Sequence, residues 1–519
     1  MPSFKSDSSF FHKIAMGAVG SREVRRDLVQ RNHEIVELER GSLDAKIWKD
    51  VKRKRVRIPD LLCTCCGQRI EVRAKSEPRI SMSHSPTIPE RRWDYGMVAT
   101  DWIALPICKE QPGVEEHADH WTRGMLVGDL SYWNEKEWVN WAPEGAVNYF
   151  GVDAFRNVPP DKTDRKGAEE GSETILTWRS CFSPIAGTIQ SITDSFITVS
   201  PTVGLPRRAG RKNMRLHVQA GNVVRQNQIM ACNADPLPNT ALTCRRNLTE
   251  QSIVEMLRAP QLPVRFSGVK LARLNSIRTV ETAIRHIAAD ADEDIYVRLE
   301  ASAYLCAVHN DDVAGAFAEA MAARDKPDQL EAVIAIGEVG NVAAAHILAE
   351  ILGDGRKDYF LRSAAAYCLG RLGSFQVART ALVRAFEAQS HRVREDALVA
   401  LADTGFGAIA DLLAGLARSN SAEIQAGCAE VVRWLAHRSD PETVATRIVP
   451  GVARTLQAQD RTALSVWLGG QLPADIIRPA LGAVLDSDAR LAYALSVAWA
   501  FAQSWIAPLH DGFNPPMAR

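Results

Sequence analysis

A nine-residue motif recurs in the second half of the chain at a nearly fixed spacing. Its form is apolar-Arg-x-x-Ala-x-x-x-Leu, and its copies begin at Val297, Leu361 and Val393, which are 64 and 32 residues apart. A weaker copy fills the gap at residues 328–340, and Ile424 begins another copy 31 residues after Val393. A period of this length is typical of arrays in which each unit is a pair of amphipathic helices stacked on the next pair. The sequence therefore predicts an α-solenoid, with small residues in the packed helices and Gly340, Gly373 and Gly405 ending motif-bearing helices.

The repeat resembles HEAT repeats of the short bacterial type over roughly residues 275–510. This resemblance implies an extended surface that binds a protein partner or a nucleic acid. The arginine of the motif has two interpretations. In one, the arginines form a ladder that meets phosphates; they are Arg298, Arg362 and Arg394. In the other, each arginine pairs with an acid of the adjacent repeat, for which Asp294, Asp358 and Glu395 are available.

Charged and apolar residues alternate between residues 69 and 75. If this segment is a strand, its charged side chains share one face, namely Glu71, Arg73 and Lys75. The turn at residues 63–67 folds Asp60 back beside Glu71, so that two carboxylates converge near a cation. Two carboxylates can hold a magnesium ion, and a nearby ammonium group can stabilise the charge that develops on a phosphate. The pattern predicts a metal-dependent phosphodiesterase.

Pro59-Asp60 followed by Glu71-Val72-Arg73 resembles the PD-(D/E)xK nuclease superfamily. The resemblance implies a restriction-endonuclease-like α+β fold, with Asp60 and Glu71 as magnesium ligands. The lysine role falls to Arg73 in strict register or to Lys75 one pleat further on. This is a departure from the family pattern, because arginine stays charged and can stabilise charge without taking up a proton. The alternative is that these charges only form salt links on an edge strand.

A basic tract lies directly before Pro59 and Asp60. Between residues 46 and 92 there are thirteen Lys or Arg against five Asp or Glu, although the whole chain is balanced at 62 of each sign. Such a tract suits a polyanion such as DNA, and it is otherwise a solvated surface segment. The candidate nucleic-acid contacts are Lys52, Arg53, Lys54, Arg55 and Arg57.

Cys63 and Cys66 form a Cys-x-x-Cys-Gly turn, which is half of a zinc knuckle because the turn points two thiolates at one tetrahedral ion. No second pair lies at a diagnostic spacing, so the zinc hypothesis requires distant ligands, and otherwise the cysteines are thiols. The residues considered for the second pair are His84, Cys108, His117, His120 and Cys181.

Residues 183–231 alternate short apolar runs with turn glycines, which predicts a small β-barrel. The segment resembles the biotinyl/lipoyl-type barrel-sandwich hybrid. It lacks the lysine of a carrier domain and has instead a basic insertion, so we expect a spacer or docking module rather than a swinging arm. The basic residues of the insertion are Arg207, Arg208, Arg211 and Lys212.

The 519 residues exceed one ordinary core and indicate about three domains. We predict a multidomain chain: a nuclease-like α+β domain (1–165), a small β-barrel (172–240) and a HEAT-repeat α-solenoid (260–519). The N-terminus lacks the apolar core of an export signal, and the longest apolar stretch, 491–502, is too short to cross a bilayer, so we expect a cytoplasmic protein without a membrane partner.

Two functions from different classes follow. The first is a magnesium-dependent endonuclease or nucleic-acid-binding protein in DNA metabolism or anti-phage defence, whose solenoid recruits a protein partner. The second is a non-catalytic HEAT-repeat scaffold or adaptor for protein–protein interaction.

Overall fold

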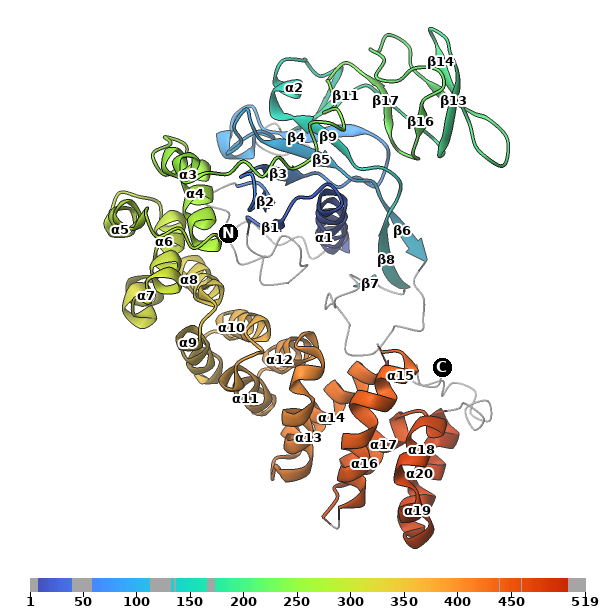
Figure 1. Cartoon of the computed structure of the whole chain (residues 1–519), viewed down its shortest axis with the longest axis vertical. Coiled ribbons are helices and arrows are strands. Elements are labelled where there is room, and N and C mark those ends of the chain that lie inside the picture. Colours follow the sequence, from blue (N-terminus) through green and yellow to red (C-terminus); the bar gives the residue numbers. More distant parts are fainter. Residues whose placement is uncertain are drawn as a thin grey trace. The chain divides into compact units, whose positions relative to one another are not determined.

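The computed structural model describes residues 8–39, 58–112, 132–134, 137–165, 173–437, 439–458 and 460–502. The described residues form two compact units: the first reaches to Ala301, and the second begins at Ser302. Figure 1 shows small sheets in the N-terminal part of the chain and paired helices in the C-terminal part. The two units are described separately below.

A five-stranded mixed sheet is the centre of the first unit. Its order is β1-β2-β3-β5-β9, in which β3 and β5 are parallel and the other neighbours are antiparallel. The strands are β1 (Ile35–Glu37), β2 (Leu61–Cys63), β3 (Arg69–Val72), β5 (Trp102–Leu105) and β9 (Asn148–Gly151). Because β3 lies between two neighbours, the charged segment is not on an edge strand, as one alternative had assumed.

Apolar side chains cover both faces of this sheet. On one face, Val24 and Leu28 of α1 (Ser8–Val29) pack against Ile70 and Tyr149. On the other face, Ile103 and neighbouring side chains belong to a second core that contains Trp93, Phe150, Phe155 and Trp178. Alternate residues of each strand point to opposite faces, so Ile70 and Val72 face α1, whereas Glu71 lies opposite Ile103 and faces the second core. The predicted alternation is thereby confirmed for residues 70–72, and β3 ends at Val72, before Arg73 and Lys75.

Smaller sheets complete the N-terminal region. One has the order β10-β11-β4, and its strands are β10 (Lys162–Arg165), β11 (Thr174–Trp178) and β4 (Ile80–His84). Another has the order β6-β8-β7, and its strands are β6 (Cys108–Pro112), β8 (Glu137–Pro143) and β7 (Tyr132–Asn134). The short helices are η2 (Pro89–Arg91) and α2 (Val152–Arg156). A region rich in small sheets is therefore present, and the restriction-endonuclease-like fold is not confirmed.

The segment expected as a small barrel forms two sheets around one core. The strands β12 (Ser180–Phe182) and β17 (Ile229–Cys232) pair with each other, and four strands have the order β15-β14-β13-β16. The four are β15 (Arg207–Gly210), β14 (Phe196–Ser200), β13 (Gly187–Ile192) and β16 (Val223–Val224). The basic insertion thus supplies the edge strand β15, whose exposed arginines suit an edge because charge discourages further strand pairing. The likeness to a barrel-sandwich hybrid stays a prediction.

Helices follow in pairs from residue 250 onward. Those that begin in the first unit are α3 (Glu250–Leu257), α4 (Leu262–Leu274), α5 (Glu281–Ala289) and α6 (Ile295–Val308). The second unit continues with α7 (Val313–Ala322), α8 (Lys326–Val339), α9 (Val342–Gly353), α10 (Tyr359–Arg371), α11 (Gln376–Arg384), η5 (Ala385–Glu387), α12 (His391–Asp403), η6 (Gly405–Ala408), α13 (Ile409–Arg418) and α14 (Ala422–His437). It ends with α15 (Pro441–Thr443), the π-helical turn η7 (Val444–Ile448), α16 (Val449–Gln457), α17 (Ala463–Gln471), α18 (Ala474–Leu481), α19 (Ala483–Ser487) and α20 (Ala489–Ala502).

The repeated motif lies on α6, α8, α10, α12 and α14, and the predicted solenoid is confirmed. Gly340 ends α8 in the left-handed conformation (φ 77°), as expected of a helix-terminating glycine. Gly373 has another role: a Cβ atom there would lie 2.1 Å from Thr404 Cγ2, so the glycine allows close packing of neighbouring segments.

No single helix in the described ranges is long and apolar enough to cross a membrane. The bent pair His391–Asp403 and Gly405–Arg418, with an angle of 111°, passes a test of length and composition when its two helices are taken together.

Candidate functional site

The two carboxylates predicted to bind magnesium lie across the β2–β3 hairpin from each other. Leu61 pairs with Ile70, so the antiparallel register continues to place Asp60 opposite Glu71, as the sequence predicted. Asp60 Oδ2 accepts a hydrogen bond of 2.7 Å from the backbone N–H of Val72. Glu71 is buried, and its Oε1 lies 2.8 Å from Arg73 Nη2. Both carboxylates therefore take part in contacts that hold the hairpin and its end.

The two candidate cations are also engaged. Arg73 Nη2 donates to Glu71 and to the carbonyl of Trp93, the latter at 3.2 Å. Lys75 lies beyond the end of β3, where it makes an isolated parallel bridge with Ile107, and its Nζ donates to the carbonyl oxygen of Ser81. Burial, followed by repulsion from Arg73 and Arg79, lowers the pKa of Lys75 to about 7.

The basic tract considered for nucleic-acid binding cannot be placed beside this hairpin. Lys52, Arg53, Lys54, Arg55 and Arg57 lie outside the described residues. In the part of the chain that the structure describes, Asp60 and Glu71 belong to no cluster of three or more candidate metal ligands.

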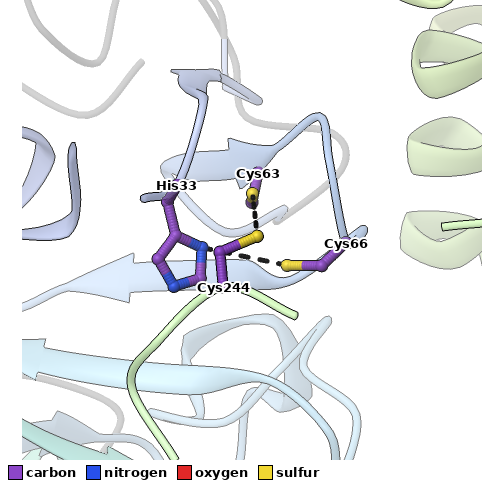
Figure 2. A group of neighbouring side chains, drawn as sticks. All are labelled: His33, Cys63, Cys66 and Cys244. Atoms are coloured by element: carbon purple, nitrogen blue, oxygen red, sulfur yellow. Dashed lines mark hydrogen bonds between the residues drawn. The ribbon is translucent and has the colours of Figure 1, made fainter. Parts of the chain in front are cut away.

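A different group does form such a cluster. One ligand atom from each of His33, Cys63, Cys66 and Cys244 lies within 4.8 Å of the other three, and the described ranges contain no other such group of three or more. Cys63 Sγ is 3.8 Å from Cys244 Sγ, and Cys66 Sγ is 3.8 Å from His33 Nδ1. Figure 2 shows the four side chains pointing toward one another from three separate segments.

Local backbone structure explains how each segment supplies its ligand. In the hairpin turn, the N–H of Gly67 donates to the Cys63 carbonyl at 2.9 Å, and Gly67 adopts φ 74°, which glycine reaches without steric cost. His33 follows the end of α1, where its N–H donates to the Leu28 carbonyl at 3.1 Å. The third segment is held beside it because the N–H of Cys244 donates to the carbonyl of Arg31 at 3.0 Å.

The hydrogen bond of the His33 ring determines which of its nitrogens faces the sulfur atoms. Nε2 lies 2.9 Å from the carbonyl oxygen of Leu242, and a carbonyl can only accept, so Nε2 carries the proton. Nδ1 is therefore the ring nitrogen that faces Cys66 Sγ. His33 is also 3% exposed, so the ring has little freedom to leave this position.

The sulfur atom of Cys63 receives hydrogen bonds that stabilise its thiolate. The pKa of Cys63 is lowered first by the thiol of Cys66 and also by the backbone N–H groups of Cys65 and Cys66. The pKa of Cys66 is raised because its proton is held in the bond to Cys63. Three sulfur ligands and one imidazole are the donor set of a soft, tetrahedral metal site.

Sequence spacing could identify only half of this cluster. Cys63 and Cys66 were found through the Cys-x-x-Cys-Gly turn, whereas His33 and Cys244 carry no local signal. Of the residues considered for the second pair, Cys108 and Cys181 are buried elsewhere, and Cys181 belongs to the core of the two small sheets. His84 is in β4, and His117 and His120 lie outside the described residues.

Two of the motif arginines, Arg362 and Arg394, contact backbone carbonyls. Arg362 Nε donates to the carbonyl of Leu352 at 2.8 Å, and Arg394 Nη1 donates to the carbonyl of Ala388 at 2.5 Å. Asp358, which had been considered as an acid partner, instead pairs with Lys326 at 2.8 Å. The acid pairing is therefore wrong for Arg362 and Arg394, whose guanidinium groups satisfy carbonyls left open near the end of the preceding helix.

The weaker copies of the motif have glutamine at the same position, and it makes the same contact. Gln329 Nε2 donates to the carbonyl of Ala323 at 2.7 Å, and Gln425 Nε2 donates to that of Ser419 at 2.6 Å. Because a neutral amide can replace the arginine, the shared property of this position is hydrogen-bond donation to the preceding turn and not positive charge.

One family model matches part of the repeat region. Residues 316–402 match the family model described as HEAT repeats. Similar solved structures include YibA of E. coli, with 13% identity, 49% of this chain and 91% of that chain covered, and a TM-score of 0.24. The complex of CpcE and CpcF of phycocyanin lyase from Nostoc has 14% identity, 45% and 96% coverage, and a TM-score of 0.23. Human deoxyhypusine hydroxylase in complex with glycerol has 19% identity, 44% and 97% coverage, and a TM-score of 0.17.

No curated protein matches the chain. The C-terminal region carries HEAT repeats, and such repeats typically mediate protein–protein interaction.

Proposed function

We propose that the protein is a non-catalytic scaffold whose HEAT repeats hold a protein partner. The observation that carries this proposal is the match of residues 316–402 to HEAT repeats. Within this region, the arginine or glutamine of the motif binds a carbonyl of the preceding helix or turn and so joins consecutive helices. The repeats thus contribute surface rather than reactive groups, and an extended helical surface suits a protein ligand.

The state of the hairpin residues supports the same choice. Asp60, Glu71 and Lys75 each make a hydrogen bond or ion pair that joins strands or their ends. A nuclease would need these carboxylates to coordinate a metal ion, which would require exchanging protein contacts for metal contacts. The charges of the hairpin are accounted for by the fold alone.

A magnesium-dependent nuclease is the second candidate, and the specific observation that favours it is the register that places Asp60 opposite Glu71. A role in DNA metabolism or anti-phage defence depends on this activity. The same hairpin can thus be tested for catalysis directly.

One experiment separates the two candidates. The full chain, tagged and purified from the cells that encode it, should retain one stoichiometric protein partner after treatment with DNase and RNase. The double variant Asp60→Asn/Glu71→Gln should keep this partner. Tyr359→Ser should weaken the interaction, because Tyr359 is 45% exposed within the matched repeats and aromatic side chains are enriched at interfaces.

Val203→Ser is the matched surface control, since Val203 is 90% exposed and lies far from the repeats in sequence. The scaffold proposal is overturned if the wild type cleaves DNA or RNA with magnesium and the Asp60→Asn/Glu71→Gln variant does not. It is also overturned if nuclease treatment removes every copurifying protein.

A further inference from the structure

The chemistry of the cluster formed by His33, Cys63, Cys66 and Cys244 is not used by the scaffold proposal. We propose that these four residues bind one zinc ion, and that this ion ties the β2–β3 hairpin to the end of α1 and to the segment that leads into the first repeat helices. The zinc site proposed from the sequence is thereby completed by ligands 30 residues before Cys63 and 178 residues after Cys66.

The spacing of the ligand atoms fits a single tetrahedral ion. With zinc–sulfur bonds of about 2.3 Å, tetrahedral geometry separates two sulfur ligands by about 3.8 Å. Cys63 Sγ and Cys244 Sγ are 3.8 Å apart, as are Cys66 Sγ and His33 Nδ1. An iron–sulfur cluster divides its protein ligands between different irons, so it fits four mutually close ligand atoms less well.

The surrounding hydrogen bonds match those of a metal site. A histidine that ligates a metal usually donates its other N–H to a carbonyl or carboxylate, and His33 Nε2 makes such a bond to Leu242. Cys63 Sγ also accepts the backbone N–H groups of Cys65 and Cys66, and Cys244 Sγ accepts that of Arg246. These donors offset the negative charge that three thiolates bring to one ion.

A disulfide is the competing explanation for neighbouring cysteines. A disulfide needs two sulfur atoms about 2.0 Å apart, whereas Cys63 and Cys244 are 3.8 Å apart. A disulfide between them would also not explain why Cys66 Sγ and His33 Nδ1 face each other at 3.8 Å. A metal ion accounts for all four side chains at once.

The ion has a structural consequence within the first unit. The turn between Cys63 and Cys66 carries carbonyls that hold the next part of the chain: Cys65 O accepts from the N–H of Leu248 at 3.1 Å, and Thr64 O accepts from Asn275 Nδ2 at 3.3 Å. Leu248 precedes α3, and Asn275 follows α4. By fixing this turn, zinc would fix the place where the first repeat helices leave the N-terminal sheets.

Metal analysis of the purified full chain is the first test. Wild type should contain about one zinc per chain and no stoichiometric iron, as a four-ligand structural site requires. Cys66→Ser and Cys244→Ser should each reduce zinc to background. Cys65→Ser is the matched control, because Cys65 lies in the same turn but outside the cluster, and it should keep its zinc.

A second variant covers the case in which serine substitution prevents folding. His33→Cys preserves four ligands and should retain the metal, and cobalt substitution should then change its visible absorption from that of the wild-type site. Alkylation gives an independent readout: Cys63, Cys66 and Cys244 should be protected until a chelator removes the ion, whereas the reactivity of Cys65 should not depend on the chelator.

The zinc assignment is overturned by any of three results. These are wild type purified from zinc-replete cells without zinc, wild type with stoichiometric iron, or a disulfide linking Cys63 to Cys244 in the freshly purified protein. Equal loss of zinc from Cys65→Ser and Cys66→Ser would overturn the ligand set.

Discussion

At the scale of one residue, Lys75 had two interpretations in the sequence, a catalytic cation or a structural contact. The nuclease-like pattern made this lysine a candidate catalytic cation. In the structure its ammonium group donates to the Ser81 carbonyl, and its backbone N–H donates to the Pro106 carbonyl at 3.0 Å. Burial and the neighbouring Arg73 and Arg79 lower the pKa of Lys75 to about 7. The lysine therefore carries an electrostatic cost that depends on pH.

This cost predicts a pH dependence of stability. In the unfolded chain Lys75 keeps a pKa near 10.5, so between pH 7 and 10 the unfolded state binds more protons than the folded state. The contribution of Lys75 to the free energy of unfolding should rise with pH across this window, and below pH 7 the full cost should remain. Lys75→Met should lack this dependence. The difference between the free energies of unfolding of wild type and variant should change by about 3–4 kcal/mol between pH 7 and 10.

Urea denaturation of both proteins at several pH values measures this difference. Taking the variant as reference cancels the titration of other groups in the same window. A difference that stays constant from pH 7 to 10 would mean that the ammonium group is well solvated in the folded protein.

The same reasoning applies to the motif arginines at the scale of an element. Each repeat must satisfy the carbonyls at the end of its preceding helix, because an α-helix leaves its last carbonyls without internal partners. Arg362 does this for Leu352 and is only 8% exposed, and Gln329 and Gln425 do it in neighbouring repeats. The recurring polar position therefore joins consecutive helices.

Arg362→Met tests this role. Methionine keeps most of the apolar volume but leaves the Leu352 carbonyl without its donor, so the free energy of unfolding should fall by about 1–3 kcal/mol. Arg356→Met is the control, since Arg356 is 92% exposed and pairs with Asp354 two residues away, and this variant should unfold like wild type. Far-UV circular dichroism during urea denaturation compares them. Equal loss of stability in both variants would count against the capping role.

At the scale of the whole molecule, α3 bears on where a fragment that contains the repeats should begin. The sequence predicted a domain beginning at residue 260. Immediately before it, α3 is capped by Thr249, whose Oγ1 accepts from the N–H of Ser252 at 3.1 Å, and it buries Ile253 and Leu257. Gly268 of α4 allows this contact, because a Cβ atom there would lie 2.9 Å from Met256 Cβ. We therefore expect residues 249–259 to fold together with α4, which belongs to the same unit.

A fragment of residues 249–519 should accordingly be largely helical and more stable than a fragment of residues 260–519. Burial of the two apolar side chains of α3 favours the longer fragment by on the order of 3 kcal/mol, before the entropy of ordering α3 is subtracted. A fragment of residues 302–519 should be the least stable, because it begins inside α6. Circular dichroism during urea denaturation measures the free energy of unfolding of the three fragments. Equal values for the fragments that begin at residues 249 and 260 would contradict this prediction.

The sequence by itself determined those features that depend on neighbouring residues. The spacing of Val297, Leu361 and Val393 was sufficient for the solenoid, since each repeat packs mainly on the next. Alternation along residues 69–75 predicted which side chains share a face, and Cys63 to Gly67 predicted a tight turn. These inferences depend on helix and strand periods, which are properties of the local chain.

Only the tertiary structure decided which distant groups meet. His33 and Cys244 join Cys63 and Cys66 because the end of α1 and the segment before α3 both pass the β2–β3 hairpin, an arrangement that no local spacing encodes. The roles of Arg362 and Lys75 were likewise open in the sequence, because a cation can face a phosphate, an acid or a carbonyl. In the folded chain each of the two side chains donates a hydrogen bond to a backbone carbonyl, Arg362 to that of Leu352 and Lys75 to that of Ser81.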